Sequence, residues 1–297
     1  MRLAYRGSVN SWECDENAHL NVRFYVEKHW QTLCGGIGEL GVEPQLGAHE
    51  LLQRVSVQHI RFLQECRLAA PLSGYIGIVY ADSSHMDVLT ELRQSFTDEP
   101  VSACIHRFTG LGGDTTDDLP QHAAPRGLAD QDLPHTALLL AEAERYGFKT
   151  IGMGVIQASE CTTDVLQGGV SIAHVHNYMA RLSDSMPHLW GLMRAESGQL
   201  EEHEGGAVLE YRMRYHRPLK MGERFILNSG LNAVSAKVQR FAHLMFSKDQ
   251  GDLCVSAEAV GVRMDLHERR AKVLSDEMRA HMSQRLIRPM GNTKLNH

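Results

Sequence analysis

The sequence lacks the features that mark secreted, membrane and metal-binding proteins. Its six cysteines, at positions 14, 34, 66, 104, 161 and 254, form no CxxC pair, which favours reduced thiols over a disulfide framework. No stretch approaches the roughly 20 apolar residues of a membrane span, and the first residues contain no apolar signal-peptide core. We therefore expect a cytoplasmic protein with no membrane partner.

The chain also lacks an excess of basic residues. It has 30 Lys and Arg against 36 Asp and Glu, a formal net charge of −6 over 297 residues. A nucleic-acid surface needs a clustered basic face, so we expect no nucleic-acid partner. Seventeen histidines are present, but His174, His176 and His216 have no third ligand at a metal-binding spacing. We expect neither a metal nor a cofactor.

What the chain does contain is an internal repeat. Glu13-Cys14 recurs as Glu160-Cys161, and Arg61-Phe62 recurs as Arg214-Tyr215, at separations near half the chain length. The same order is kept by three further pairs: Phe96-Thr97 with Phe246-Ser247, 101–103 with 255–257, and 71–74 with 218–222. A common order predicts two copies of one domain, which suits a chain long enough for two cores.

Each copy has the pattern of an α+β domain. Leu209, Tyr211 and Met213 alternate with charged residues, which is typical of a half-buried strand. We expect an antiparallel sheet preceded by one long helix in each copy. The expected helices cover 22–40 and 172–193, the second broken at Pro187, with short helices over 136–146 and 275–286. The expected strands cover 3–12, 55–65, 75–82, 88–96, 101–108, 209–216, 223–234, 238–246 and 253–265.

These patterns predict four parts of the chain. Residues 1–110 form an N-terminal domain, and 111–148 form a linker that ends in a short helix. Residues 149–270 form a C-terminal domain, and 271–297 form a final helix and tail. The linker is predicted from its Gly-Gly, Thr-Thr-Asp-Asp and Pro content, which shows little periodicity.

The densest set of chemically capable side chains precedes the first long helix. Asp15, His19 and Asn21 lie within seven residues of one another. A helix N-terminus offers free N–H groups and the positive end of the helix dipole, so it stabilises negative charge. A carboxylate beside it can activate water or attack directly. The alternative interpretation is a capping loop with no catalytic role.

This segment resembles the signature of hotdog-fold acyl-CoA thioesterases of the 4-hydroxybenzoyl-CoA thioesterase-like family. That signature is Asp, two variable residues, Gly-His, one variable residue, Asn and, after three more residues, Tyr. Asp15, His19, Asn21 and Tyr25 match it, and Ala18 stands where the family usually has Gly. The resemblance implies two tandem hotdog domains, each a long helix wrapped by an antiparallel sheet, packed as an intrachain pseudo-dimer. It leaves open whether two chains associate further.

The resemblance also implies an activity and its residues. The reaction is hydrolysis of an acyl-CoA thioester to a free acid and coenzyme A, with Asp15 as general base or nucleophile. His19 bonds the thioester oxygen or positions Asp15, Asn21 holds the loop or caps the helix, and the helix N-terminus stabilises the oxyanion. The second copy should complete the pocket around Asp15.

The second copy departs from the signature. Thr162 matches Asp15, and the interval from Thr162 to Tyr178 is six residues longer than the interval from Asp15 to Tyr25. Threonine cannot replace a carboxylate base, so we expect one competent site per chain unless Glu160 or Asp164 serves in the second copy.

Two other functions remain open. A hotdog enoyl-CoA hydratase also combines Asp, Asn and His, but Asp15 and His19 are one residue closer than its Asp-x4-His pattern requires, and its Pro is absent. A non-catalytic acyl-CoA-binding protein would bind the thioester without releasing thiol. The sequence identifies neither the acyl group nor the residues that hold the phosphates of coenzyme A.

Overall fold

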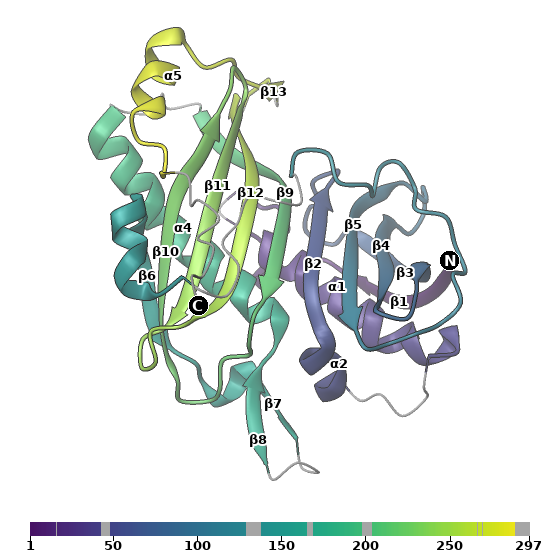
Figure 1. Cartoon of the computed structure of the whole chain (residues 1–297). Coiled ribbons are helices and arrows are strands. Elements are labelled where there is room, and N and C mark those ends of the chain that lie inside the picture. The colour runs from purple at the N-terminus through teal and green to yellow at the C-terminus, as the bar shows by residue number, and fades with distance from the viewer. Residues whose placement is uncertain are drawn as a thin grey trace.

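One antiparallel sheet organises the molecule. The computed structural model describes residues 1–15, 17–42, 48–128, 138–164, 169–197, 204–265, 267–268 and 270–288. The main sheet has 11 strands in the order β1-β3-β4-β5-β2-β9-β12-β11-β10-β6, with β13 paired to β12 (Figure 1). The strands are β1 (Arg2–Ser8), β2 (Val55–Phe62), β3 (Pro71–Ala81), β4 (His85–Gln94), β5 (Pro100–Thr109), β6 (Lys149–Val155), β9 (Glu204–Tyr215), β10 (Arg224–Val234), β11 (Val238–Ser247), β12 (Leu253–Asp265) and β13 (Arg270–Ala271).

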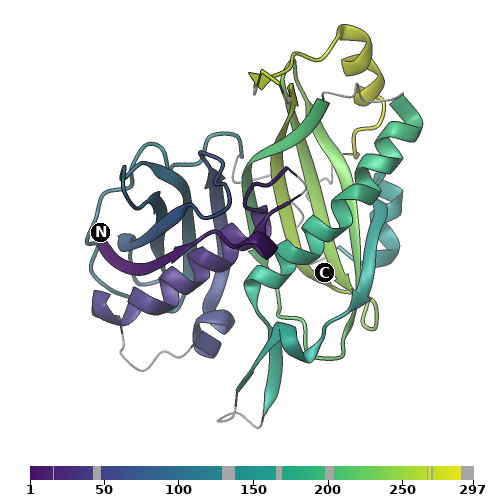
Figure 2. The same cartoon turned by 180° about the vertical axis from the view of Figure 1, so that it is seen from behind.

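The helices lie against this sheet. They are α1 (Val22–Gly36), α2 (Ala48–Arg54), α3 (Leu140–Ala143), α4 (Val175–Ser197) and α5 (Asp276–Ser283). Short 3₁₀ turns occupy Ser11–Glu13, Ile37–Leu40, Glu144–Tyr146 and Ala158–Glu160. The two long helices, α1 and α4, pack against each other on one face of the sheet (Figure 2).

The two halves of the sheet are related by a pseudo-twofold axis. The order β1-β3-β4-β5-β2 is repeated in mirrored sequence by β6-β10-β11-β12-β9, and β2 pairs with β9 at the seam. An offset of 153 residues maps Val57 onto Glu210 and Arg61 onto Arg214. Val57 faces Arg214 and Arg61 faces Glu210 in the β2/β9 register, so the axis passes between the two strands. The fold is therefore the predicted pair of tandem hotdog domains, packed as an intrachain pseudo-dimer.

Each long helix is held by the apolar side it turns to the sheet. In α1, Tyr25, Val26, Trp30 and Leu33 are all at most 5% exposed. Burying a side chain of this size contributes about 1.5–3 kcal/mol, so the helix is stabilised mainly by the sheet that wraps it. The same face also buries His29, which is 0% exposed.

His29 begins a chain of buried hydrogen bonds that reaches the second half. Its Nδ1 lies 2.9 Å from Thr90 Oγ1, and Thr90 Oγ1 lies 2.8 Å from His106 Nε2. His106 Nδ1 lies 2.9 Å from Gln58 Nε2, and the Tyr215 hydroxyl donates to Gln58 Oε1 at 2.5 Å. The Gln58 amide donates to His106, so His106 accepts at Nδ1 and is neutral. Burial lowers the pKa of His106 to about 3 and lowers that of His29 well below its usual value.

The structure confirms that the chain contains two copies of one domain, but it changes which residues of the two copies are equivalent. The backbone N–H of Leu20 donates to Cys66, and that of Ala173 donates to Leu219, which again gives an offset of 153. Before the two long helices, Glu13 and Glu160 close equivalent 3₁₀ turns, at an offset of 147. The difference is a six-residue insertion in the second half, which forms the hairpin of β7 (Cys161–Asp164) and β8 (Val170–Ala173).

Three of the predicted pairs do not consist of equivalent residues in the two copies. Phe96 is 90% exposed in a turn, whereas Phe246 is fully buried, so the two are not equivalent. Ser102 corresponds to Val255 rather than to Ser256, because Phe62 pairs with Ser102 and Tyr215 pairs with Val255. The predicted match of 71–74 with 218–222 is wrong as well, because Ala69 and Gly222, both at positive φ, make the equivalent turn.

Two helix predictions need correction. The second long helix begins at Val175, because Ile172 belongs to β8 in the inserted hairpin. It is also not broken at Pro187 but continues through it to Ser197. The packing of α4 against both α1 and β6 holds the helix together where the proline removes one backbone hydrogen bond. The elements α2, β6, β7 and β8 were not predicted.

The expected linker is packed against the first half. Thr116 and Asp117 donate their backbone N–H groups to Ile78 O at 2.9 and 3.1 Å, and the Asp117 carboxylate accepts from the N-terminal ammonium of Met1 at 2.5 Å. Leu111 and Ala123 are buried. These contacts make residues 110–128 a covering layer. The rest of the predicted loop, 129–133, lies outside the described residues.

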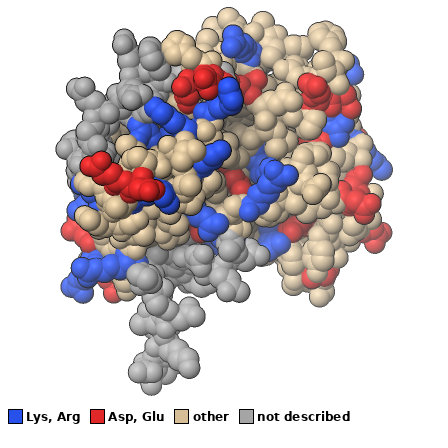
Figure 3. Space-filling view, turned by 90° about the horizontal axis from the view of Figure 1, so that it is seen from above, with Lys and Arg blue, Asp and Glu red and all other residues tan. Residues whose placement is uncertain are grey.

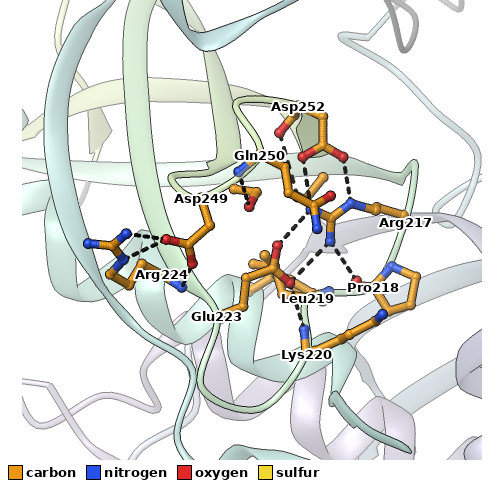
Figure 4. A network of polar contacts seen from close by, with 12 residues as sticks. Arg217, Pro218, Leu219, Lys220, Glu223, Arg224, Asp249, Gln250 and Asp252 are labelled. Atoms are coloured by element: carbon orange, nitrogen blue, oxygen red, sulfur yellow. Dashed lines mark hydrogen bonds and ion pairs between the residues drawn. The ribbon is translucent and has the colours of Figure 1, made fainter.

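A polar network fixes the far end of β9 (Figure 4). Arg217 binds Asp252 through Nε and Nη2 at 2.5 and 2.8 Å. The same guanidinium binds Glu223 at 2.7 and 3.1 Å. Beside this network, Arg224 binds Asp249 on the surface, with its Nε 2.6 Å from the carboxylate.

We expect Arg217→Leu to lower the free energy of unfolding by about 2–4 kcal/mol, because it leaves two carboxylates without their partner. Arg224→Leu is the matched control and should cost less than about 1 kcal/mol, because that pair is solvent-exposed. Urea unfolding measures both values. Equal losses in the two variants would contradict the assigned role of Arg217.

Candidate functional site

The loop before α1 is closed by Asp15. Its backbone N–H donates to His19 O at 2.8 Å. Its carboxylate oxygen Oδ1 accepts from the backbone N–H groups of Asn17 and His19 at 2.9 and 3.1 Å. Among the described residues, the second oxygen, Oδ2, has no donor. One oxygen of this carboxylate therefore makes the predicted capping contacts, and the other has no protein donor among the described residues.

Ala18 keeps the backbone shape of the glycine that it replaces. Its φ is +59°, in the left-handed region that costs a residue with a Cβ roughly 1 kcal/mol. The N–H of Ala18 donates to Asp15 O at 3.0 Å, which closes the turn. We expect Ala18→Gly to raise the free energy of unfolding slightly, by up to about 1 kcal/mol, as measured by urea denaturation.

Asn21 joins the loop to both long helices. It is the N-cap of α1, and its Oδ1 accepts from the backbone N–H of Arg23 at 3.1 Å. The same oxygen accepts from Ser183 Oγ of α4 at 3.2 Å. The contacts of Asn21 are therefore those of a helix cap that also fixes α4 beside the loop.

The hydroxyl of Tyr25 is fully used by the backbone. It donates to Gln64 O and accepts from the N–H of Cys66, both at 3.1 Å. Burial raises the pKa of Tyr25 well above its usual value, so the phenol stays protonated. Tyr25 ties α1 to the segment after β2 and is not available as a base.

His19 is held at the edge of the loop. It is 8% exposed, and its Nε2 lies 3.5 Å from the carboxylate of Glu65. Glu65 follows β2 directly, and the sequence analysis did not identify it. The side chains of two segments, 15–21 and 62–65, therefore meet at one place.

These side chains line one cavity of about 500 Å³. Asp15, His19 and Asn21 are all part of its wall, together with Asn17 and Glu65. The opposite wall belongs to the second half and is mostly apolar: Met186, Pro187, Trp190, Ala207, Val208, Leu209 and Met264. The cavity thus combines polar groups from one hotdog domain with an apolar surface from the other.

The second half has no equivalent arrangement among its described residues. The Glu160 carboxylate is bound by Arg181 at 2.9 Å and by the backbone N–H of Gln157 at 2.8 Å, so it repeats the structural role of Glu13. Thr162 lies in β7. The side chain of Asp164 lies outside the described residues.

Helix α2 fills the space beside β7. It packs against this strand, and its Leu51 and Leu52 are buried in one hydrophobic cluster with Ile172 and Val175. Leu51 and Leu52 therefore occupy the side of the pseudo-dimer that corresponds to the apolar wall of the Asp15 cavity.

The described residues contain neither a membrane-spanning helix nor a metal-binding cluster. No described helix is long and apolar enough to cross a bilayer. No group of three or more described His, Cys, Asp or Glu residues is placed to hold a metal ion.

The sequence and the fold are both similar to those of known thioesterases. Residues 166–282 match the model of the Thioesterase-like superfamily. No curated protein matches the sequence. Among solved structures, the 12:0-ACP thioesterase from Umbellularia californica has a TM-score of 0.61 at 12% identity, covering 88% of this chain and 93% of its own.

Two further structures share the fold. An acyl-ACP thioesterase from Bacteroides thetaiotaomicron has a TM-score of 0.54 at 10% identity, covering 86% of this chain and 96% of its own. A protein of unknown function with a hot dog fold from Alicyclobacillus acidocaldarius has a TM-score of 0.51 at 12% identity, covering 88% and 95%. The fold and the sequence match together define the class, a thioester hydrolase with a double hotdog fold. The match of residues 166–282 to the thioesterase-like superfamily is consistent with the resemblance found in the sequence.

Proposed function

We propose that this chain hydrolyses an acyl-CoA thioester to a free acid and coenzyme A at the cavity that Asp15 lines. The observation that carries the proposal is the composition of this cavity. Asp15, His19 and Asn21 stand on one side, beside the N-terminus of α1, and an apolar wall stands on the other. An acyl thioester has the same two needs, a polar site for its carbonyl and an apolar site for its acyl group.

The proposed reaction uses the oxygen of Asp15 that the loop leaves unbound. Asp15 Oδ2 takes a proton from water while the water oxygen attacks the thioester carbon. The N–H of Val22 and the positive end of the α1 dipole stabilise the developing oxyanion, and His19 holds the thioester oxygen or orients Asp15. The C–S bond then breaks, and the thiolate leaves and takes up the proton. Direct attack by the carboxylate is the alternative, and it would pass through an anhydride.

We propose a single competent site per chain. Thr162 cannot act as a base, and Leu51 and Leu52 fill the space on the side where a second acyl wall would lie. We also propose the domain boundaries expected from the sequence, with 1–110 supplying the polar groups and 149–270 supplying the apolar wall. Cytoplasmic location remains a prediction.

The first test is thiol release from a panel of short, branched, aromatic and long acyl-CoAs. Thiol release at a saturable rate supports the proposal. The competing hydratase function predicts water addition to an enoyl-CoA with no thiol release, and a binding protein predicts acyl-CoA binding without either reaction. Either of those results would replace the proposed function.

Trp190 is expected to limit the length of the acyl chain. It lines the Asp15 cavity, and its ring meets Phe241 edge to face, with centroids 5.7 Å apart. Phe241 lines a second, largely apolar cavity of about 300 Å³ between α4, β10 and α5. The two rings therefore stand between the two cavities.

We expect Trp190→Ala to join the cavities and to raise kcat/KM for long acyl chains relative to short ones. Each buried methylene contributes about 0.8 kcal/mol, so two more buried methylenes give roughly a tenfold change. Trp12→Ala is the matched control, because Trp12 is 73% exposed. An unchanged chain-length profile in Trp190→Ala would contradict the assignment.

A further inference from the structure

A basic groove adjoins the Asp15 cavity. It has a volume of about 700 Å³ and is lined by three arginines, Arg61, Arg126 and Arg240. Phe62, Leu63 and Leu209 line both this groove and the Asp15 cavity, so the two spaces meet where β2 and β9 separate beyond the Arg61–Glu210 pair. Figure 3 looks down on this end of the molecule, where Lys and Arg side chains border a hollow together with some Asp and Glu side chains.

Arg61 is buried in the floor of the groove and fixed there by hydrogen bonds. It is 8% exposed, and its Nη1 donates to the backbone carbonyls of His122 and Ala124, the latter at 3.0 Å. Burial lowers the pKa of Arg61, and the nearby positive charge of Arg126 adds to this effect. The carboxylate of Glu210 partly offsets both effects. An anion bound between Arg61 and Arg126 would further reduce the repulsion between these two like charges.

The Glu210 carboxylate holds the backbone of Arg126 in place, and both of its oxygens already accept hydrogen bonds. Its Oε1 accepts from His59 Nε2 at 2.6 Å and from the N–H of Arg126 at 3.1 Å. Its Oε2 accepts from the N–H of Gly127 at 2.8 Å. A Cβ at Gly127 would lie 2.8 Å from Val260 and 3.1 Å from Glu210, so a larger residue here would displace these two side chains. Within the described part of the chain, Arg126 and Arg240 form no ion pair.

The net charge makes this cluster unusual. The chain carries −6 overall, yet the described lining of this groove has three guanidinium groups and one carboxylate, that of Glu210, which is already bonded. Guanidinium groups bind phosphate oxygens in bidentate fashion. A ligand that enters the Asp15 cavity with its thioester and carries phosphates at its other end would satisfy both sites.

We propose that Arg61, Arg126 and Arg240 bind the phosphates of coenzyme A, and that its pantetheine arm passes between Phe62 and Leu209 to the Asp15 cavity. The inference rests on the proposed function, because it assigns the remainder of the same substrate. Arg126 and Arg240 contact the phosphates from the surface. Arg61 supplies charge from below and anchors 122–124 to β2.

The test separates nucleotide binding from turnover. Adenosine 3′,5′-bisphosphate is titrated calorimetrically into the full chain and into Arg126→Ala and Arg240→Ala. The matched control is Arg145→Ala, which removes an exposed charge outside the groove. We expect each groove variant to weaken binding about tenfold and the control to leave it unchanged. Binding that is absent in the native chain, or equal in all four proteins, overturns the proposal.

Kinetics then distinguish the two proposals. For an acyl-CoA, the groove variants should raise KM about tenfold and leave kcat unchanged, and salt should raise the KM of the native chain. For the matching acyl-pantetheine, which has no phosphate, the same variants should change nothing. Turnover of both substrates with equal KM overturns the phosphate site and leaves hydrolysis standing. Arginine-dependent nucleotide binding without turnover supports the phosphate site and overturns hydrolysis.

One further outcome would redirect the assignment. If an acyl-carrier-protein thioester is hydrolysed with an arginine-dependent KM while the nucleotide does not bind, the groove recognises an acidic protein surface. That result overturns the coenzyme A assignment.

Discussion

Asp15→Asn is expected to lower kcat for thioester hydrolysis by about 10²- to 10⁴-fold, the usual contribution of a positioned general base. The substitution is matched to the structure. An Asn side chain keeps the oxygen that accepts from Asn17 and His19, so the loop should keep its shape while the base is lost. Thiol release measures the effect, and circular dichroism and urea unfolding check the fold.

Two further variants separate catalysis from loop structure. Asp15→Ala also removes the acceptor, so it should lose about a further 1 kcal/mol of stability, as at other capping positions. Asp184→Asn is the matched control, because Asp184 is an exposed carboxylate of α4 outside the lining of the Asp15 cavity. Native activity in Asp15→Asn would sink the assignment of the base.

The second large effect is loss of stability in mild acid. Burial lowers the pKa values of His106 and His243 to about 3, and that of His29 also falls well below its usual value. In the unfolded chain these residues titrate near pH 6.5. Below that pH the unfolded chain binds protons that the folded chain does not, so the free energy of unfolding falls as the pH falls.

We expect each of these histidines to cost about 2 kcal/mol of stability between pH 7 and pH 5. This window lies above the usual carboxylate range, so the buried histidines should dominate it. Urea unfolding at several pH values measures the slope. The loss is complete only below the folded-state pKa values, near pH 3 for His106 and His243.

A pair of variants assigns the slope to a residue. His243 lies on β11 with its Nδ1 2.6 Å from Ser229 Oγ. His243→Gln should reduce the pH slope by about one proton, whatever its effect on stability at pH 7. His188→Gln, at an exposed position of α4, should leave the slope unchanged. A flat profile between pH 7 and pH 5 in the native chain would contradict the burial argument.

Local patterns were sufficient for much of the fold. The alternation at Leu209 to Tyr215 predicted β9, and the apolar positions after Asn21 predicted α1, because both patterns report which face of one element meets a core. The errors occurred where tertiary packing overrode a local rule. Pro187 would break an isolated helix, but contacts with α1 and β6 maintain α4 through it.

The internal repeat was also predicted only in part from the sequence. The sequence contained the duplication and the six extra residues before Tyr178. It did not show that these residues form the hairpin of β7 and β8, because the segment has no pattern of its own that distinguishes a hairpin from a loop. Phe96 and Phe246 were paired by residue type alone, although one is exposed and the other buried.

Some residues of the candidate site could be predicted from the sequence, and others could not. Asp15, His19 and Asn21 could be found in the sequence, because a turn and a helix N-terminus bring neighbouring residues together. Glu65, Trp190 and the arginine groove could not, because they come from strands and helices far apart in the chain. Contacts between 19–20 and 66–67 bring Glu65 to the loop, and the pairing of β2 with β9 brings the residues of the second half to it.

The sequence by itself therefore determined the class of domain, its duplication and the loop that presents Asp15, since each of these depends on short-range spacing and periodicity. Tertiary structure alone decided which second-half residues complete the cavity, that α2 fills the corresponding space beside β7, and that Arg61, Arg126 and Arg240 line one groove. The physical reason is that side chains distant in the chain meet only when the two halves of the sheet join in one register, and no local pattern encodes that register.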